Sequence, residues 1–191
     1  MRDPDDELIR LSQQGSKTAF GKLVDRYYEM VFVLAFGILH HHEGARDVTQ
    51  DVFLKVFREI KNFKGESKFK TWLYRVAVNA AIDALRKQRP HEHLDGTDVS
   101  DEDEKPPLIV LDRRAGPREK ASESEMRALV REALDKLSPD HRAALVLREW
   151  HELSYEEMAH ALGIELGTVM SRLHYARKKL SEILSLRLME Y

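Results

Sequence analysis

Residues 153–179 read LSYEEMAHALGIELGTVMSRLHYARKK, and this stretch decides the fold of the C-terminal part of the chain. Ser154 and Glu157 have the spacing of a capping box, in which each side chain accepts a hydrogen bond from the backbone N–H of the other residue. The capping box predicts a short helix over residues 154–162. A glycine-containing turn and a longer helix over residues 168–184 are expected to follow it. A short braced helix, a turn and a longer helix are typical of a helix-turn-helix.

The second helix of such a motif enters the major groove of DNA, so its exposed residues are candidate DNA contacts. Residues 166–180 contain four basic side chains and no acidic one. We expect Ser171, Arg172 and Tyr175 to read bases and the later cations to contact phosphates. An ordinary helical hairpin with a cationic face is the alternative. The candidate DNA contacts on this helix are Thr168, Ser171, Arg172, His174, Tyr175, Arg177, Lys178 and Lys179.

The rest of the chain also has helical periodicity, with apolar residues recurring every three or four positions. No stretch alternates with the period of two that strands require, so the sequence predicts an all-α fold. Ser16 and Ser138 are expected to cap helices, and a turn is expected around residues 40–44. The predicted helices run from Asp3-Pro4 to Gly15, from Ser16 to Ile38, from Val48 to Ile60, from Phe69 to Leu85, from Met126 to Leu137 and from Ser138 to Trp150.

Charge and proline content divide the chain into three segments. The whole chain has 191 residues, with 31 Lys and Arg against 33 Asp and Glu. Residues 1–90 have a net charge of +4, residues 91–121 of −4 and residues 122–191 of −2. The middle segment holds four of the six prolines if Pro90 at its edge is counted, and no apolar period. We therefore predict two small helical domains, 1–90 and 122–191, joined by a flexible acidic linker.

Composition narrows the function classes. The chain has no cysteine, which excludes disulfides, cysteine-ligated metals and thiol nucleophiles. The N-terminus lacks the pattern of a signal peptide, and the longest apolar stretch, residues 30–39, is too short to cross a bilayer. We expect a cytoplasmic protein without a metal or other cofactor. The run His40-His41-His42 is expected to be a solvated turn, although a loop can arrange two of these histidines around a metal ion.

Residues 61–89 combine cations with aromatic side chains, as single-stranded nucleic-acid sites do. Asn79 can pair with a base edge, and Asp83 is expected to form an ion pair with Arg86 or Lys87. Each aromatic residue taken singly is as well explained by core packing, and we expect Phe69 and Trp72 to be mostly buried. The candidate nucleic-acid contacts in this segment are Lys61, Phe63, Lys64, Lys68, Lys70, Trp72, Tyr74, Arg75, Asn79, Arg86 and Lys87.

Three stretches together resemble the extracytoplasmic-function (ECF) family of bacterial RNA polymerase sigma factors. Residues 47–57, DVTQDVFLKVF, look like region 2.2, which in that family binds the clamp of core RNA polymerase. Residues 63–87 look like regions 2.3 and 2.4, which melt and read the −10 element. Residues 153–173 look like region 4.2, which reads the −35 element. The resemblance implies that Asp47, Gln50, Asp51 and Phe53 bind core polymerase.

The resemblance also implies partners and a mechanism. Promoter DNA would be opened without ATP, with base pairing exchanged for protein contacts. An anti-sigma factor, commonly linked to a membrane, would hold the protein inactive, and no small-molecule substrate is expected. Met170 and Tyr175 stand where many members of the family have a basic residue, so Arg172 carries more of the expected sequence readout.

Two other function classes remain open at the level of the sequence. A conventional helix-turn-helix regulator would bind an operator alone and use residues 1–90 as a sensor or dimerisation domain. An enzyme is the weaker alternative, because the sequence contains no Walker A, His-Glu-x-x-His or Gly-x-Ser-x-Gly motif.

Overall fold

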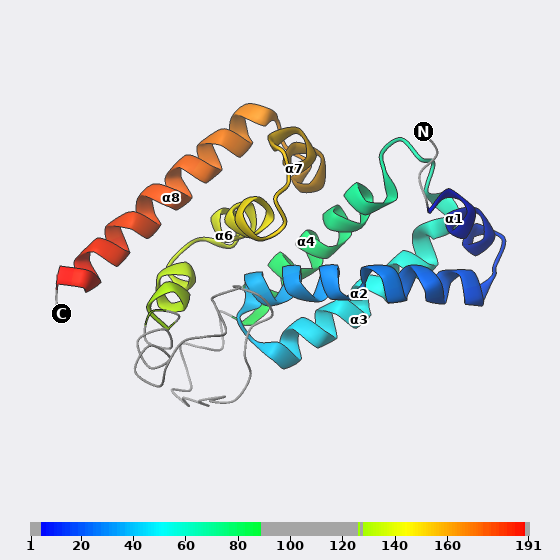
Figure 1. The fold of residues 1–191 in the computed structure, drawn as a ribbon, viewed down its shortest axis with the longest axis horizontal. Helices are drawn as coiled ribbons and strands as arrows, with labels where there is room; N and C mark the ends of the chain where they lie inside the picture. The colour runs from blue at the N-terminus through cyan, green and yellow to red at the C-terminus, as the bar shows by residue number, and fades with distance from the viewer. Residues whose placement is uncertain (1–4, 89–125, 127, 190–191) are drawn as a thin grey trace, which may run out of the picture.

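The computed structural model describes residues 5–88, 126 and 128–189, and within them all regular structure is helical. The all-α prediction is therefore confirmed. The predicted linker, residues 91–121, lies outside the described residues. The N-terminal half consists of α1 (Asp6–Gln13), α2 (Lys17–Leu39), α3 (His42–Glu59), the 3-10 turn η1 (Ile60–Asn62) and α4 (Phe69–Gln88) (Figure 1). The C-terminal half consists of a helix over residues 128–135, α6 (Pro139–Leu145), the π-helical turn η2 (Val146–Trp150), α7 (Tyr155–Leu162) and α8 (Leu166–Met189).

The helix starts follow from local capping. The Ser16 hydroxyl accepts a hydrogen bond from the Ala19 N–H at 3.2 Å, as predicted for an N-cap. Ser138 caps α6 in the same way, with Pro139 in the first turn. Both bonds of the predicted capping box of α7 are present, at 3.2 and 2.9 Å. Gly163 ends α7 with a positive φ of 66°, which glycine adopts without strain.

The structure corrects several predicted boundaries: among others, α3 begins at His42 and not at Val48, and α8 ends at Met189 and not at residue 184. The turn between α2 and α3 is shorter than residues 40–44, because the His41 ring caps α3 by accepting the Gly44 N–H at 3.0 Å. α8 begins two residues earlier than predicted, at Leu166. The helix predicted up to Trp150 changes to a π-helical turn from Val146, and the His151 N–H donates to the Val146 carbonyl. The predicted start of the first helix at Asp3 lies outside the described residues.

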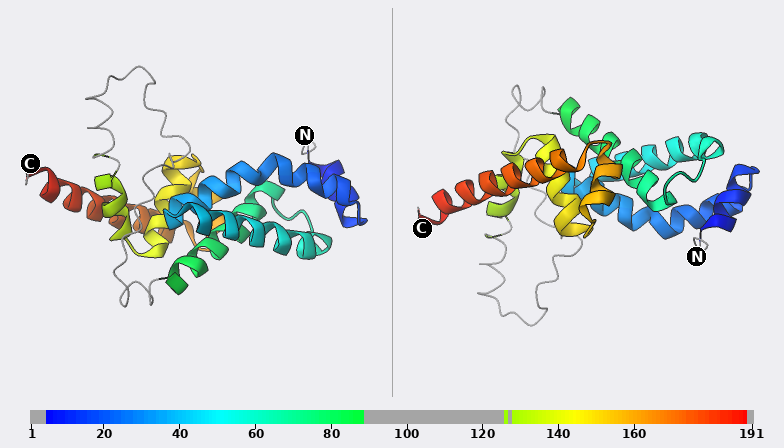
Figure 2. Two further views of the ribbon diagram at one scale, coloured as in Figure 1. Left: turned by 90° about the horizontal axis from the view of Figure 1, so that it is seen from below. Right: turned by 90° about the horizontal axis from the view of Figure 1, so that it is seen from above.

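The N-terminal half is a bundle in which α2, α3 and α4 pack along one another and α1 packs on α2 (Figures 1 and 2). In the C-terminal half α6 and α7 both pack on α8, which extends away from the bundle to the C-terminus. α7, the turn after it and α8 form the predicted helix-turn-helix. Val169, Leu173 and Ala176 face its interior, as the sequence pattern indicates.

One continuous apolar core joins the two halves. α4 packs on α6 and α7, and α2 packs on α6 and η2, so buried side chains from both halves form a single cluster. The Arg142 side chain of α6 is buried inside this contact and donates a hydrogen bond to the Ile38 carbonyl of α2 at 2.8 Å. That carbonyl belongs to the last turn of α2, where no intrahelical donor remains for it. Among the described helices, none has the length and apolar character needed to span a membrane.

Replacing Ser154 with alanine tests how much the capping box stabilises the helix-turn-helix. Ser154→Ala removes the hydrogen bond that the Ser154 hydroxyl accepts from the Glu157 N–H, one of the two bonds of the capping box. The free energy of unfolding should therefore fall by about 1 kcal/mol. The measurement is urea denaturation followed by circular dichroism. Ser181→Ala, at an exposed position of α8, is the control and should change stability by less than about 0.5 kcal/mol. Equal midpoints for the two variants would contradict this account.

Candidate nucleic-acid and protein interfaces

α3 presents a polar edge beside an apolar groove. Asp47, Gln50 and Asp51 are all exposed on α3, as predicted, on the side away from its buried valines. A groove of about 630 Å³ lies between α2 and α3 and has Gln50 in its wall. Its apolar lining is formed by Phe20, Val24, Tyr28, Phe53, Leu54 and Phe57. Lys17 and Arg46 complete the lining, whereas the exposed carboxylates of Asp47 and Asp51 are on the same helix but not among the lining residues. An open apolar groove with polar and charged side chains around it is suited to a protein partner.

The apolar residues of this groove differ in exposure, and one differs from its sequence expectation. Phe53, the predicted polymerase contact, is only 8% exposed and offers little more than one edge of its ring. Phe57, the last residue of the stretch 47–57, is 44% exposed and packs edge-on against Phe20. Leu54 and Tyr28, which no motif in the sequence marks, are also more than two-fifths exposed. Large exposed apolar side chains in one groove are the structural signal that the sequence pattern missed.

The aromatic residues of the predicted −10 contacts form a packed cluster. Phe63, Phe69 and Trp72 contact one another with ring centroids 5.2–5.8 Å apart. Phe69 is 2% exposed, as predicted, whereas Phe63 and Trp72 are only partly buried. The partly buried rings lie next to the loop that contains Gly65. In this arrangement Phe63 and Trp72 are the aromatic side chains of the cluster that a nucleic-acid base can reach.

The cations of the same segment lie along the surface of the loop and α4. The exposed candidates are Lys61, Lys64, Lys68, Lys70, Arg75, Asn79, Arg86 and Lys87. Arg86 does not pair with Asp83 in the structure; its guanidinium instead donates to Asp140 of α6 at 3.2 Å. The expected ion pair therefore gives way to a longer-range one, because α6 brings a carboxylate against the end of α4.

The exposed side of α8 agrees largely with the predicted recognition helix. Met170 and Tyr175 are 49% and 59% exposed. The other exposed candidates on α8 are Thr168, Ser171, His174, Arg177, Lys178 and Lys179. Arg172 differs from them, since its side chain is only 24% exposed and forms an ion pair with Asp140 at 3.1 Å. Asp140 thus lies between Arg172 of α8 and Arg86 of α4.

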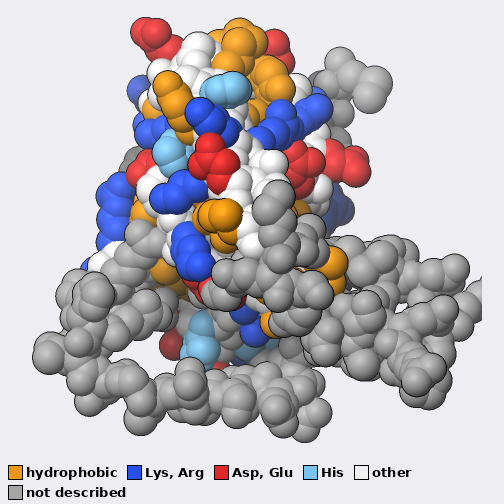
Figure 3. Space-filling view, turned by 90° about the vertical axis from the view of Figure 1, so that its left-hand side faces the viewer, with side chains coloured by type: hydrophobic (Ala, Val, Ile, Leu, Met, Phe, Trp, Pro, Cys, Tyr) orange, Lys and Arg blue, Asp and Glu red, His pale blue; other side chains and the backbone are white. Residues whose placement is uncertain are grey.

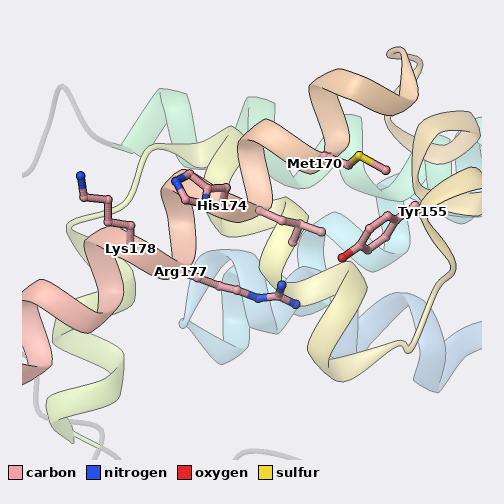
Figure 4. Close-up of a pocket in the computed structure, with 6 residues that line it drawn as sticks. Tyr155, Met170, His174, Arg177 and Lys178 are labelled. Carbon is pink, nitrogen blue, oxygen red and sulfur yellow. The ribbon is translucent and has the colours of Figure 1, made fainter.

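A shallow groove of about 450 Å³ runs along α8 beside the start of α7. Figure 4 shows Tyr155 and Arg177 extending toward each other across this groove, while Lys178 points away from it. Arg177 donates to Glu149 at 2.7 Å, and this carboxylate raises the pKa of the guanidinium. Arg177 therefore links α8 to η2, and its use as a phosphate contact competes with an existing ion pair.

Charge on the end of the molecule that α8 occupies is mixed. Figure 3 shows Lys and Arg side chains interspersed with His, Asp and Glu rather than one unbroken basic surface. The predicted phosphate contacts of α8 would therefore depend on individual cations and not on a strong overall field.

Tyr74 and His151 connect the two halves. The Tyr74 side chain of α4 is 3% exposed, and its hydroxyl lies 3.2 Å from the His151 Nδ1. Burial lowers the pKa of His151 to about 4, with a further contribution from Lys70 of α4. Burial also raises the pKa of the Tyr74 hydroxyl, and the carboxylate of Glu157 in α7 adds to that effect. Tyr74, predicted from the sequence to contact DNA, is instead buried in this structure against His151, a residue that no motif in the sequence marks.

The three consecutive histidines have separate structural roles. His40 ends α2 with a φ of 56° and bonds to Asp135 through Nδ1 at 2.9 Å. His41 caps α3, and His42 packs edge-on against Phe32. Burial would raise the pKa of the Asp135 carboxyl, but His40 and Arg142 lower it on balance. Among the described residues, no group of three or more His, Asp or Glu side chains is arranged to hold a metal ion.

The buried His151 predicts a loss of stability in mild acid. The folded pKa of about 4 lies below the ordinary value of 6.5, so between these values the unfolded chain binds a proton that the folded chain does not. Stability from this residue is therefore present above pH 6.5 and is lost as the pH falls toward 4.

The measurement is urea denaturation of the wild type and of His151→Gln at about pH 7.5 and about pH 5.5. Between these conditions the unfolding equilibrium constant of the wild type should rise about tenfold more than that of the variant. Identical pH dependences would show that His151 is not held neutral by burial.

Comparison with known proteins agrees with this geometry. Residues 23–91 match the family Sigma-70 region 2, and residues 127–180 match the family Sigma-70, region 4. The chain is 36% identical over 177 residues to the ECF RNA polymerase sigma-E factor of Haemophilus influenzae. That match covers 91% of this chain and 92% of the relative.

Two solved structures have the same fold over most of the chain. The structure of CnrH in complex with the cytosolic domain of CnrY has a TM-score of 0.69 at 26% identity, covering 96% of this chain and 99% of that one. The sigma factor RpoE in complex with the anti-sigma factor NepR, from Bartonella quintana, has a TM-score of 0.61 at 25% identity. It covers 87% of this chain and 96% of that one. With both sigma regions matched in order and a relative matched over nearly its whole length, the chain belongs to the ECF family of RNA polymerase sigma factors.

Proposed function

We propose that this chain is an alternative sigma factor: it binds core RNA polymerase and directs it to promoters, where the N-terminal half melts the −10 element and the C-terminal half reads the −35 element. The observation that carries the proposal is the combination, in one chain, of a helix-turn-helix with an exposed reading face and a separate half with an acidic edge beside an apolar groove. A DNA-binding module alone needs no such second surface.

The groove between α2 and α3 supports the polymerase contact. Gln50 supplies a hydrogen-bond acceptor in its wall, and Leu54 and Phe57 supply exposed apolar area within it. Asp47 and Asp51 are exposed on the same helix, α3. Apolar anchors surrounded by polar groups are the usual composition of a specific protein interface. The groove extends the predicted contact from α3 to α2, through Phe20 and Tyr28.

The loop before α4 supports the −10 contact. Phe63 and Trp72 offer partly exposed rings on which an unpaired base can stack, at about 1–3 kcal/mol per base. Lys64 and Lys68 lie exposed in the same loop, where they can follow the phosphates of a single strand. Capturing an unpaired base offsets the few kcal/mol that unstacking costs, so DNA can be opened without ATP.

The exposed residues of α8 support the −35 contact. Ser171 and Tyr175 face solvent near the start of the helix, where base edges are reached. Arg172 is the residue on this face with the donor geometry for a guanine, once it leaves Asp140. Lys178 and Lys179 are exposed further along and suit phosphates.

The remaining predictions follow from the proposed role. The domain boundaries at residues 90 and 122 remain a proposal, as do the cytoplasmic location and a role that involves no catalysis. We expect an anti-sigma factor linked to a membrane; the Bartonella quintana sigma factor, similar in fold, was solved with an anti-sigma factor bound.

Run-off transcription tests the proposal and separates it from a conventional helix-turn-helix regulator. Purified core RNA polymerase is incubated with genomic promoter fragments, with and without the chain. We expect initiation at discrete start sites only when the chain is present. If no start sites arise and the chain alone shifts duplex DNA, the protein is a regulator and the sigma role is wrong.

Replacing Leu54 tests the polymerase groove. Leu54→Ser removes exposed apolar area without opening a cavity, so stability should change by less than about 0.5 kcal/mol. The affinity for core polymerase, measured by fluorescence anisotropy of labelled chain, should fall by about tenfold, the loss of one apolar anchor. Leu186→Ser, at a 66% exposed leucine of α8 outside the groove, is the matched control. Equal affinities of both variants would place the polymerase contact elsewhere.

Arg172 and Lys179 should have different effects on −35 recognition. Arg172→Ala should lower the preference for the cognate −35 sequence by about 1–3 kcal/mol at one base pair. Lys179→Ala should weaken binding equally for all sequences and reduce the salt slope by about one. The measurement is open-complex formation by polymerase carrying each variant on a promoter series with single substitutions. If Arg172→Ala lowered open-complex formation equally on all promoters of the series, Arg172 would be a phosphate contact and not a base contact.

A further inference from the structure

A side chain of α1 holds the loop that carries the proposed −10 contacts. The Gln13 carboxamide donates to the Ile60 carbonyl at 3.1 Å and to the Phe63 carbonyl at 2.9 Å. Ile60 is the first residue of η1, and Phe63 is the residue that directly follows it. Both hydrogens of one amide nitrogen are therefore used, and they fix the backbone at the two ends of the 3-10 turn.

α1 can hold this loop because the helix is itself fixed to the bundle. Asp5, directly before α1, is 1% exposed, and its carboxylate accepts hydrogen bonds from Arg26 and Tyr27 of α2. Ile9, in the middle of α1, belongs to the continuous core. Gln13 is the last residue of the helix, so it reaches the loop from a position that burial and hydrogen bonds already define.

The held backbone carries the ring on which a base is proposed to stack. The Phe63 ring lies 5.2 Å from that of Trp72 and 5.8 Å from that of Phe69, measured between centroids. The Phe69 ring in turn lies 5.6 Å from that of Tyr27, the α2 residue that binds the start of α1. Residues 63–68 have no regular secondary structure, so the position of this ring depends on contacts from other elements.

We propose that Gln13 is a positioning residue for the −10 contact: through the Phe63 carbonyl it holds the Phe63 ring in the place where an unpaired base stacks. The proposal rests on the proposed function, because it assigns a supporting residue to the −10 contact proposed there. A ring that is already held loses less conformational entropy when a base stacks on it. Without the two Gln13 bonds, the loop has to be ordered at the moment of base capture, which weakens capture.

Gln13→Met tests the proposal, with Gln14→Met as the matched control. Methionine is similar to glutamine in length and volume but has no N–H donor, so the change at Gln13 removes both bonds with little effect on packing. Gln14 is exposed, and the same substitution there should change nothing that is measured. Gln13→Lys returns N–H donors to the loop, because its ammonium group has three, and should restore what Gln13→Met loses.

The measurement uses holoenzyme assembled from core polymerase and each variant. Its ligand is a fluorescein-labelled single strand with the non-template −10 sequence of a promoter found by run-off transcription. Gln13→Met should bind this strand about tenfold more weakly than the wild type, whereas Gln14→Met and Gln13→Lys should stay within about twofold of it. Affinity for a duplex with the −35 sequence alone should be equal for all four proteins, because α8 is the proposed contact there.

A double-mutant cycle with Phe63→Leu separates positioning of this ring from a general structural role. Phe63→Leu keeps an apolar side chain but has no ring on which a base can stack. If Gln13 acts through the ring, Gln13→Met should weaken binding of the single strand by less than about twofold in the Phe63→Leu background.

Hydrogen–deuterium exchange of the free chain is a second readout that needs neither polymerase nor DNA. Exchange of residues 61–68 should be at least about tenfold faster in Gln13→Met than in the wild type, with α7 and α8 unchanged. Unchanged exchange in α7 and α8 also shows that the variant is folded. Gln13→Ala removes the same two bonds and should give the same results, so the test stands if Gln13→Met fails to fold.

Two outcomes would overturn the proposal. Equal affinity of Gln13→Met and the wild type for the single strand would show that the loop needs no support from α1. An equal loss with and without Phe63→Leu would show that Gln13 does not act through this ring. Neither outcome bears on the proposed function, which fails only if the wild-type chain gives no start sites with core polymerase.

Discussion

The close approach of Trp150 to Gly37 is the constraint on which the arrangement of this molecule depends. A residue with no side chain in α2 allows an indole ring from the C-terminal half to reach the helix backbone. Around this point Arg142 is buried against the Ile38 carbonyl and Tyr74 against His151. The core is continuous across the halves for this reason, although each half has its own helices and its own proposed partner.

This constraint gives several polar residues two possible states. Arg86 and Arg172 are paired with a carboxylate when the halves are together, and they are the residues proposed to contact DNA when the halves are apart. Burial lowers the pKa of His151 to about 4 while the halves are in contact.

Local sequence signals predicted the helices well and the contact between halves not at all. Ser16, Ser138 and Ser154 identified helix starts because an N-cap depends on residues only three positions apart. The exposed face of α8 followed from the periodicity of Val169 and Leu173. Tyr74, by contrast, was expected to face DNA and is buried by His151, 77 residues later in the chain. Arg142 and Gly37 appear in the sequence only as a cation and a glycine within apolar runs. Neither pattern predicts which distant residue the side chain or backbone contacts.

The most direct test of the account is the separation of α4 and α8 in the complex that transcribes. Nitroxide labels at Asp83→Cys and Glu165→Cys are measured first in the free chain and then in the open complex with core polymerase and a promoter. The account predicts that the short distance of the free chain is replaced by one several times longer, on the scale of the roughly 85 Å between the two promoter elements. A short distance that persists in a complex shown to be making transcripts would contradict it.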